Sequence, residues 1–379
     1  MGTSKKAVAA GHICLDITPA FPHKAVKNIE QVLSPGKLVH VKGIDIHPGG
    51  SVANTGLAMK VLGADVSLMG KVGDDEFGRL VSDFLEKYDA GDGLIVSKGE
   101  DTAYSIVLAV PGLDRIFLHN PGANDTFAYD DIQWDTVSRA SLFHFGYPTQ
   151  MKGLYQDKGR ELVRIFKKVK EGGTAVSLDM AAIDEASAAA SADWKEILKN
   201  LLPYVDFFVP SAEELCFMLD RDRYRRWMEE ARGKDVTDVI TMEDIQFLGQ
   251  RAMDYGARVV LIKCGAPGIY FRTAPETEMT ELCTKLNLSV KSWAGKEGFE
   301  SSYEPDAVIS GTGAGDTCIA AFLSSVLNED PLEEALHLAA AAGACCVASY
   351  DALSGLKSME EMKERIAKGW KKTNNREVR

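Results

Sequence analysis

Long hydrophobic runs, C-x-x-C cysteine pairs and excess positive charge are all missing from this sequence of 379 residues. No apolar run reaches the ~18 residues that a membrane-spanning helix needs, so we expect no membrane span. The seven cysteines lie apart from histidine-rich segments, which argues against a zinc site and favours reduced, buried thiols. A formal net charge of −12 disfavours binding to nucleic acid or to an anionic membrane surface.

The start of the chain carries no recognisable targeting segment. Residues 1–6 are short and polar, and an apolar stretch that suits a first strand follows directly, so we expect a cytoplasmic protein. Met1 and Gly2 fit the beginning of a myristoylation motif, but the sixth residue is Lys6 instead of serine or threonine.

Two common nucleotide-binding fingerprints are also missing. The chain has no G-x-G-x-x-G after its first apolar stretch and no G-K-[ST], which argues against a dinucleotide-binding site and a Walker-type site. An NAD-dependent dehydrogenase is therefore set aside.

What the sequence does contain is a regular alternation of strand and helix signals. From residue 141 on, short apolar stretches at 141–145, 174–179, 205–209 and 258–263 are separated by helical patterns. Such alternation is typical of a parallel sheet that is covered on both faces. Earlier, residues 7–14 resemble a buried strand. The expected fold is therefore α/β, with a doubly wound, mostly parallel sheet and helices on both faces.

Helix caps are expected before two of the N-terminal helices. Ser51 is a good N-cap for a helix that follows Gly49 and Gly50, and Asp74 or Asp75 suits the start of the next helix. Three later segments are expected outside the regular core: a solvated insertion at 220–238, an irregular surface excursion at 273–305 and a frayed tail at 368–379.

Two alternating segments predict a small β-sheet lid. Residues 38–48 alternate apolar and polar side chains, and residues 101–120 contain two such runs around a turn, which indicates a β-hairpin. The core then comprises residues 1–37, 49–100 and 121–379. An edge hairpin of the main sheet fits the same pattern equally well. Tyr104 and Phe117 on the hairpin either cover a ligand or form the hairpin's own core.

The first candidate for chemistry is the segment SGTGAGD at residues 310–316, which precedes an apolar helix. Glycines let the backbone approach a ligand, and the free N–H groups of a helix start attract an anion. Gly313, Ala314 and Gly315 thus form a candidate anion hole with the Asp316 carboxylate beside it. Phosphoryl transfer to an alcohol needs such donors and a base for the hydroxyl proton. Taken alone, Asp316 is explained even more simply as a helix-capping residue.

The second candidate is the segment GGSVAN at residues 49–54. Gly49 and Gly50 leave room for a ligand at a helix start, and Asn54 offers a donor and an acceptor to a polyol about one turn later. Close packing of the glycines against a neighbouring element is the alternative. A strand and the pattern G-x-x-G-x-D-x-x-G follow, ending at Gly78.

Together the two segments resemble the paired signatures of the ribokinase-like (pfkB-type) carbohydrate kinases. G-G-x-x-x-N followed by G-x-x-G-x-D-x-x-G matches the N-terminal signature, and residues 310–316 match D-T-x-G-A-G-D. The similarity extends in outline from about residue 7 to about residue 358. It implies an α/β core with a β-sheet lid, Mg-ATP as the phosphoryl donor and a monosaccharide of the ribose, fructose or keto-deoxy sugar acid type as the acceptor.

The resemblance also implies roles for single residues. It makes Asp316 the base and the Gly313–Gly315 amides the anion hole. Glu214 would organise magnesium. Gly146 is expected beneath the substrate because it lacks a side chain. The implied sugar contacts are Asp16, Gly49, Gly50 and Asn54, and the implied ATP contacts are Lys263, Gly265, Gly268 and Thr312.

Departures from the family pattern leave several points open. Ser211 replaces the asparagine of an N-x-x-E element, and Ser310 and Gly311 replace D-T, so activation by a monovalent cation is open. A nucleoside kinase of the adenosine type and a non-catalytic relative that binds sugar or nucleotide are the alternatives. Residues 49–59 contain no cation, which weakly disfavours a sugar phosphate as acceptor. A homodimer formed through the lid is a further hypothesis.

Overall fold

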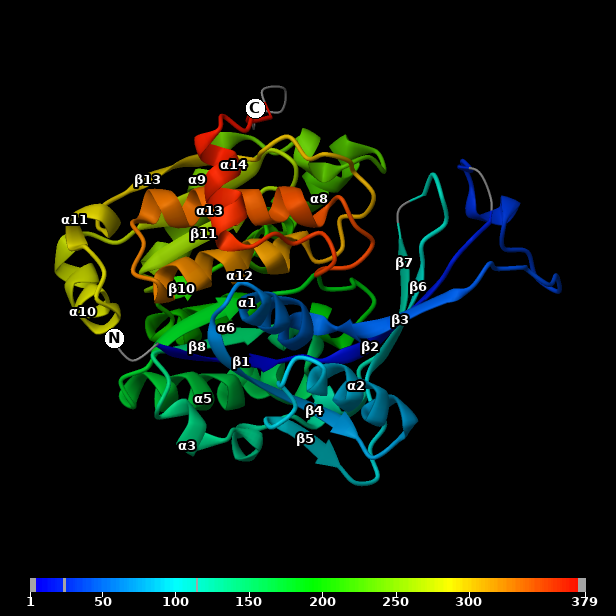
Figure 1. The fold of residues 1–379 in the computed structure, drawn as a ribbon, viewed down its shortest axis with the longest axis horizontal. Coiled ribbons are helices and arrows are strands. Elements are labelled where there is room, and N and C mark those ends of the chain that lie inside the picture. Colours follow the sequence, from blue (N-terminus) through cyan, green and yellow to red (C-terminus); the bar gives the residue numbers. More distant parts are fainter. Residues whose placement is uncertain (1–4, 23–24, 114, 374–379) are drawn as a thin grey trace.

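The computed structural model describes residues 5–22, 25–113 and 115–373, and Figure 1 shows their arrangement. The strands are β1 (Lys6–Gly11), β2 (Cys14–Pro19), β3 (Ile44–Gly49), β4 (Asp65–Gly73), β5 (Leu94–Ser97), β6 (Tyr104–Leu108), β7 (Ile116–Asn120), β8 (Leu142–Gly146), β9 (Ala175–Asp179), β10 (Phe207–Phe208), β11 (Val259–Lys263), β12 (Gly268–Thr273) and β13 (Glu297–Ser301).

The helices follow the alternation that the sequence predicts. They are α1 (Ala58–Val61), α2 (Glu76–Glu86), α3 (Trp134–Val137), α4 (Lys152–Tyr155), α5 (Arg160–Glu171), α6 (Trp194–Leu201), α7 (Ala212–Leu219), α8 (Arg221–Ala231), α9 (Met242–Asp254), α10 (Glu276–Leu286), α11 (Val290–Trp293), α12 (Ala314–Leu327), α13 (Leu332–Cys346) and α14 (Met359–Ala367). Within the described part of the chain, none of them is both long and apolar enough to cross a membrane.

The main sheet has nine strands in the order β13-β12-β11-β10-β9-β8-β1-β4-β5. Pairing is parallel from β11 to β5, and β12 and β13 add an antiparallel edge. Both faces are buried, because Ala7 and Ala9 of β1 join one hydrophobic cluster and Val8 and Ala10 join another. This confirms the predicted doubly wound α/β fold. It also brings the carboxyl ends of the parallel strands to one edge, where ligands bind in such sheets.

A second sheet of four strands, in the order β3-β2-β6-β7, projects from the side of the main body (Figure 1). The predicted hairpin is β6 and β7, and it belongs to this sheet instead of the main one. The sheet also takes in β2, although residues 14–19 read as core. The strand expected at residues 7–14 ends earlier, at Gly11, whose φ of 125° lets the chain change direction before β2 begins at Cys14.

The strand register places four polar residues side by side across the small sheet. Asp16 pairs with His47 and Ser105, and Ser105 pairs with His119. Cross-strand partners share a face, so these residues form a polar row, which we call the lid row. Tyr104 is next to Ser105 and therefore faces the opposite way, where its ring contacts Phe77 at a centroid distance of 5.5 Å.

Helix starts were predicted with mixed success. Asp75 is the N-cap of α2, where its carboxylate accepts a hydrogen bond from the Gly78 N–H at 2.8 Å. Ser51, however, has helical φ and ψ and makes no capping bond. The expectation for Ser51 was wrong because Gly50, with a φ of 80°, already turns the chain into a helix that begins with a π-helical segment, Val52–Leu57.

Two segments expected to be irregular are ordered. The excursion at 273–305 contains α10, α11 and β13, and Trp293 is fully buried against Phe207 and Phe322. In the tail, Trp370 stacks on Tyr303 at 4.8 Å. Both segments are polar in sequence, and a few large aromatic side chains anchor them. The remainder of the predicted frayed tail, 374–379, lies outside the described residues.

Candidate active site

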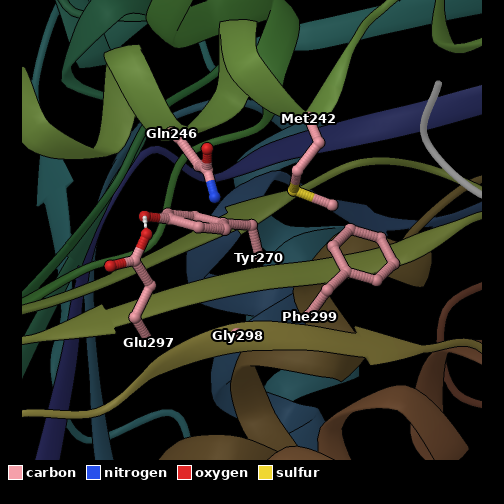
Figure 2. Close-up of a pocket in the computed structure, with 6 residues that line it drawn as sticks. All are labelled: Met242, Gln246, Tyr270, Glu297, Gly298 and Phe299. Carbon is pink, nitrogen blue, oxygen red and sulfur yellow. Dashed lines mark hydrogen bonds between the residues drawn. The ribbon is translucent and has the colours of Figure 1, made fainter.

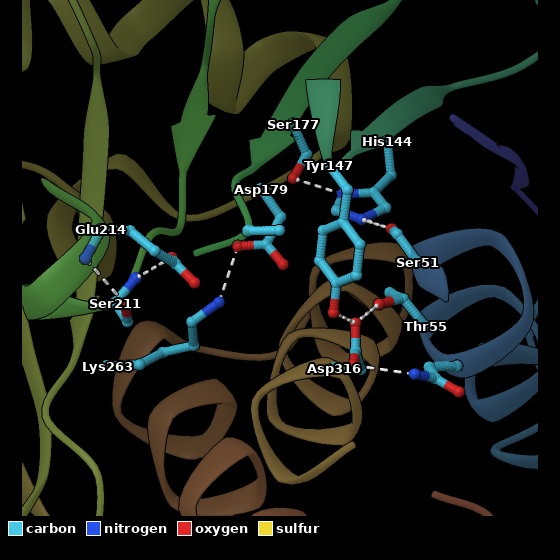
Figure 3. A network of polar contacts seen from close by, with 12 residues as sticks. Ser51, Thr55, His144, Tyr147, Ser177, Asp179, Ser211, Glu214, Lys263 and Asp316 are labelled. Carbon is cyan, nitrogen blue, oxygen red and sulfur yellow. Dashed lines mark hydrogen bonds and ion pairs between the residues drawn. The ribbon is translucent and has the colours of Figure 1, made fainter. Parts of the chain in front are cut away.

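Asp316 lies in the first turn of α12 and is 4% exposed. Three side chains from two other parts of the chain donate hydrogen bonds to its carboxylate (Figure 3). The donors are Tyr147 Oη to Oδ1 at 2.7 Å, Thr55 Oγ1 to Oδ1 at 3.0 Å and Asn54 Nδ2 to Oδ2 at 3.2 Å. Because the carboxylate binds distant side chains instead of the N–H groups of its own helix, it does not act as a helix cap.

Two opposing effects set the pKa of Asp316. Burial raises the pKa, whereas the hydrogen bond from Tyr147, the charge of Lys263 and the bonds from Thr55 and Asn54 lower it. Burial dominates, so the pKa lies above the usual value of an aspartate. A buried carboxylate with a raised pKa is a better proton acceptor than an exposed one.

The adjacent residues Asn54 and Thr55, which both contact Asp316, lie in the π-helical segment Val52–Leu57. Isolated π-turns within helices occur frequently at functional sites. The sequence pointed to Asn54 through its motif, but it carried no signal for Thr55, because a π-turn cannot be recognised from periodicity.

The candidate anion hole is an uncapped helix start. Gly313 is the N-cap of α12, has a φ of 74° and provides no side-chain cap. A Cβ at Gly313 would lie 2.3 Å from the Cβ of Ala352, so both the backbone conformation and the space require glycine here. The first N–H groups of a helix have no intrahelical partner. Among them, the Ala314 N–H donates to the Gly311 oxygen at a long 3.4 Å, so an anion beside Asp316 would compete with this weak bond.

Lys263 lies at the end of β11, where its ammonium forms an ion pair with Asp179 at 2.6 Å. Its side-chain atoms come within 3.5–3.7 Å of the position that a Cβ on Gly315 would occupy, so a cation that is 14% exposed lies against the start of α12. Burial lowers the Lys263 pKa, but the charges of Asp179 and Glu214 outweigh it, and the pKa lies above its usual value. Burial raises the pKa of Asp179, and the charge of Lys263 opposes this.

Glu214 is the third charged residue of this group. Its carboxylate accepts a hydrogen bond from the Ser211 N–H at 2.7 Å, and Ser211 Oγ accepts one from the Glu214 N–H, which forms a capping box at the start of α7. Burial raises the pKa of Glu214 despite the nearby Lys263. The serine that departs from the family pattern therefore has a structural role of its own.

The carboxylates of Asp179 and Glu214 suit a magnesium ion that is held largely by water and phosphate oxygens. Within the described ranges, no group of three or more histidine, cysteine, aspartate or glutamate side chains could hold a metal. Mg²⁺ commonly binds through one or two carboxylates together with substrate phosphates. The donor set thus fits a metal that arrives with a phosphorylated ligand.

On the lid side, two glycines bring side chains close to the backbone. A Cβ on Gly49 would lie 2.2 Å from Asp16 Oδ2, and one on Gly50 would lie 2.6 Å from His12 Nδ1. Close packing against these side chains is therefore enough to explain why both positions are glycine. The same packing holds Asp16 and His12 in place. Burial raises the pKa of Asp16, although the nearby His47 opposes this.

His12 is a buried polar residue for which the sequence predicted no role. It is 3% exposed, and neither ring nitrogen has a hydrogen-bond partner. Its ring lies 5.2 Å from that of His119 in the lid row and 6.2 Å from that of Tyr147. Burial lowers the pKa of His12 to about 3, so the ring is neutral at physiological pH and can both donate and accept a hydrogen bond.

Three further glycines have steric explanations. A Cβ on Gly146 would lie 1.7 Å from Ser51 Oγ, so Ser51 requires glycine at this position. Gly265 has a φ of 65° and Gly268 one of 142°. A Cβ on Gly268 would lie 2.1 Å from the Glu300 oxygen. These two glycines shape the turn between β11 and β12.

Thr312, an expected ATP contact, connects the lid to the start of α12. The guanidinium of Arg115, just before β7, donates to Thr312 Oγ1, and Ser310 Oγ also donates to Thr312 Oγ1 at 3.0 Å. The lid and the candidate anion hole are therefore in direct contact.

A separate pocket of about 480 Å³ lies between α9 and the strands β12 and β13 (Figure 2). Tyr270 Oη donates to Glu297 Oε1 within it at 2.9 Å. The other lining residues are Met242, Gln246, Gly298 and Phe299. No residue that the sequence selected lines this pocket, so it is distinct from the Asp316 site.

A helix start beside a buried carboxylate is what transfer of a phosphoryl group to a hydroxyl requires, and this arrangement places the chain among the small-molecule kinases. Residues 11–359 match the family model described as pfkB family carbohydrate kinase. The chain belongs to this family and is a phosphotransferase that acts on a sugar hydroxyl.

Known relatives are similar over most of the chain. Fructokinase-2 from Oryza sativa is 24% identical over 339 residues, covering 85% of each protein. The structure of Arabidopsis thaliana ribokinase complexed with ribose and ATP has a TM-score of 0.68 and 20% identity, and covers 96% of this chain and 98% of that one. A putative ribokinase II from E. coli in complex with ATP and Mg²⁺ has a TM-score of 0.69 and 20% identity, and covers 96% and 99%. At this identity the two structures show a shared fold.

Proposed function

We propose that this protein transfers the γ-phosphoryl group of ATP to a hydroxyl of a monosaccharide of the ribose, fructose or keto-deoxy sugar acid type. The observation that carries the proposal is the Asp316 cluster, a buried carboxylate in the first turn of a helix whose N–H groups are uncapped. Bound Mg-ATP would supply the phosphoryl group, with Glu214 and Asp179 near its metal and Thr312, Lys263 and the Gly265–Gly268 turn near its phosphates.

Different residues have different roles in the proposed phosphoryl transfer. Asp316 accepts the proton of the acceptor hydroxyl. The N–H groups at Gly313–Gly315 hold the negative charge that develops on the transferred group. Lys263 adds a buried positive charge on the same side, where low dielectric strengthens its effect.

The lid row favours an unphosphorylated, hydroxyl-rich acceptor. Asp16 offers two carboxylate oxygens to neighbouring hydroxyls, and Asn54 and His12 offer donors and acceptors nearby. The row contains no lysine or arginine, and the Asp16 charge would repel a phosphate. These properties support an unphosphorylated sugar over a sugar phosphate.

A nucleoside acceptor is less well supported. A base needs an aromatic ring on which to stack, and Tyr104 packs against Phe77 on the far face of the small sheet. Phe117 shares the face of the lid row but is 52% exposed. The small sheet therefore presents no enclosed aromatic clamp to a base.

The test is ATP turnover against a panel of acceptors. Release of ADP would be followed with pentoses, hexoses, keto-deoxy sugar acids, sugar phosphates and nucleosides. We expect one class of unphosphorylated sugar to stimulate turnover. Stimulation by adenosine alone would favour the nucleoside kinase. Thermal stabilisation by ligands without any turnover would favour a non-catalytic relative.

Replacing His12 by phenylalanine is expected to raise KM for the sugar by about tenfold and to raise the melting temperature. The ring nitrogens lack partners in the free protein, and such buried groups destabilise by about 1–3 kcal/mol each. A bound hydroxyl would provide the missing partner. Steady-state kinetics and thermal unfolding measure the two effects. An unchanged KM for the sugar would remove His12 from the acceptor site.

The lid is also expected to form a homodimer interface. Apolar side chains are exposed on and around the small sheet, including Ile44 at 58%, Phe117 at 52% and Leu118 at 53%. Exposed apolar clusters of this kind mark interaction surfaces. Phe117→Asp should convert a dimer into a monomer in equilibrium sedimentation, whereas the exposed control Tyr350→Asp should not. A wild-type protein that is monomeric at high concentration would contradict the dimer.

A further inference from the structure

The loop before α12 has Ser310 where the family pattern has an aspartate. A monovalent cation in this loop would lose part of its water, and an aspartate would offset that cost with a negative charge. Serine offers an oxygen but no charge. The carboxylate of Asp351, in the segment after α13, is bonded within its own turn, where it accepts from the N–H groups of Leu353 and Ser354 at 2.8 Å. The residues present therefore fit a monovalent cation poorly.

Hydrogen bonds within the protein hold this loop in place. The Thr312 N–H donates to Ser310 Oγ at 3.1 Å, and Ser310 Oγ donates to Thr312 Oγ1 at 3.0 Å. The Ile309 N–H donates to the carbonyl oxygen of Val347, at the end of α13, at 2.7 Å. The Cys346 thiol donates to the Thr312 carbonyl oxygen at 3.3 Å. Burial raises the pKa of this thiol to about 11, so it stays protonated and remains a donor.

Arg115 brings a positive charge to the same loop from the lid. It lies just before β7, two residues before Phe117 and four before His119, and side chains two residues apart in an extended chain point the same way. Its guanidinium lies 5.6 Å from the centre of the Phe117 ring and donates to Thr312 Oγ1. One of its nitrogens is 3.8 Å from the position that a Cβ on Gly311 would occupy. A guanidinium on the lid-row face therefore lies against the start of α12.

A guanidinium at this place changes what the loop needs from solution. An arginine side chain is always charged in proteins, and its planar donors fix the geometry of the bonds that it makes. Like charges a few ångströms apart repel each other near a protein surface, so Arg115 disfavours a second cation at Gly311 and Thr312. The positive charge that a bound ion would bring is thus already part of the chain.

We propose that Arg115 is a positioning residue for the anion hole: its guanidinium holds Thr312, and with it the Gly313 start of α12, and replaces a monovalent cation in this role. The inference rests on the proposed kinase function and adds that turnover needs Arg115 and no potassium. The N–H groups that follow Gly313 stabilise charge that develops in the transition state. A loop that loses Arg115 should therefore slow transfer more than it weakens ATP binding.

The first test uses the unmodified protein. Sugar-dependent turnover, the affinity for Mg-ATP by calorimetry and the melting temperature would each be measured in potassium chloride and in tetramethylammonium chloride. At equal ionic strength the two salts screen charges equally, so we expect turnover and affinity to agree within about threefold and the melting temperatures to coincide. Stimulation of turnover by potassium above this range overturns the replacement of a cation by Arg115.

The second test is Arg115→Ala, with Arg225→Ala as the control. Arg225 lies on α8, where its side chain is 61% exposed. We expect R115A to lower kcat at least about tenfold and to change KM for ATP by no more than about threefold, because the anion hole acts mainly in the transition state. R225A should change neither constant. A kcat of R115A within threefold of wild type, or a rise in KM for ATP with an unchanged kcat, overturns the positioning role.

The third test exchanges the guanidinium for the carboxylate of the family pattern. In Ser310→Asp combined with R115A, potassium should raise turnover more than about threefold over tetramethylammonium and should raise the melting temperature, because an ion that binds only the folded state stabilises it. R115A alone should show neither effect. A double variant whose turnover and melting temperature are the same in both salts overturns the replacement.

The binding and stability measurements separate this inference from the kinase function. If no acceptor is phosphorylated, but Mg-ATP binds equally in both salts and S310D/R115A melts higher in potassium, the kinase proposal fails and the replacement stands. If sugar transfer occurs but requires potassium, the replacement fails while the kinase stands.

Discussion

Asp316→Asn is expected to lower kcat for sugar phosphorylation by about 10²- to 10⁴-fold, with KM for ATP changed by only a few fold. The loss is that of a general base, because the asparagine amide cannot take the acceptor proton. The anion hole and Lys263 do not change, so ATP binding should persist. Steady-state kinetics with the best acceptor of the panel measure both constants. A kcat within threefold of wild type would remove Asp316 from the role of base.

The same substitution is expected to raise stability at neutral pH. Burial holds the folded-state pKa of Asp316 above its unfolded value, so the folded state binds the proton more tightly than the unfolded chain. The ionised carboxylate therefore destabilises the fold above both pKa values, and this penalty is absent below about pH 4, where both states are protonated.

Thermal unfolding at pH 7.5 and near pH 4 tests this sign. We expect a higher melting temperature for D316N than for wild type at pH 7.5 and a smaller difference at the lower pH. Asp83→Asn, an exposed change on α2, serves as the control and should alter neither activity nor melting temperature. A D316N protein that is both inactive and less stable at pH 7.5 would point to lost structure instead of a lost base.

Lys263→Met is expected to reduce the free energy of unfolding by about 3–5 kcal/mol, the usual effect of removing one partner from a buried ion pair. Methionine keeps the length of the side chain but leaves Asp179, which is 1% exposed, without its cation. Glu214 and Asp316 also lose a nearby positive charge. Denaturant unfolding measures the stability, and turnover should fall as well because the charge beside the anion hole is lost.

A second buried pair in the protein provides a matched control. Lys170 contacts Asp206 at 2.5 Å, but Asp206 is also paired with Arg258 at 2.6 Å. Lys170→Met should therefore reduce stability less than K263M and should not affect turnover, because the pair is remote from Asp316. Asp179→Asn added to K263M should recover part of the lost stability. Equal losses in K170M and K263M would contradict a special role for the Lys263 pair.

The sequence by itself determined the fold class and pointed to two segments as candidates for the site. Strand–helix alternation predicted the doubly wound sheet, because residues buried on both faces give apolar runs of recognisable length. Gly313 and Asp316 were selected as candidates for a related reason: a helix start without a side-chain cap and with a positive φ needs glycine, so the local motif is visible in the sequence. Asp75 was also predictable, since capping depends only on the next three residues.

Only the tertiary structure decided which side chains meet at Asp316. Tyr147 and Thr55 carry no motif and are 169 and 261 residues away from Asp316 in the chain. Their contacts depend on strand order and on a π-turn, neither of which appears in local periodicity. The pairing of Lys263 with Asp179 likewise follows from β9 and β11 ending at the same edge of the sheet.

The lid also shows which features the local sequence predicts and which depend on the tertiary structure. Alternation along the chain predicted a hairpin, but it did not reveal that β2 joins it, because residues 7–14 were read as one strand although β1 ends at Gly11. The register of β2 with β3 and β6 then decided that Asp16 faces the same way as His119 and that Tyr104 faces the opposite way. Local sequence determines which residues can form a strand, whereas long-range pairing decides which side chains share each of its faces.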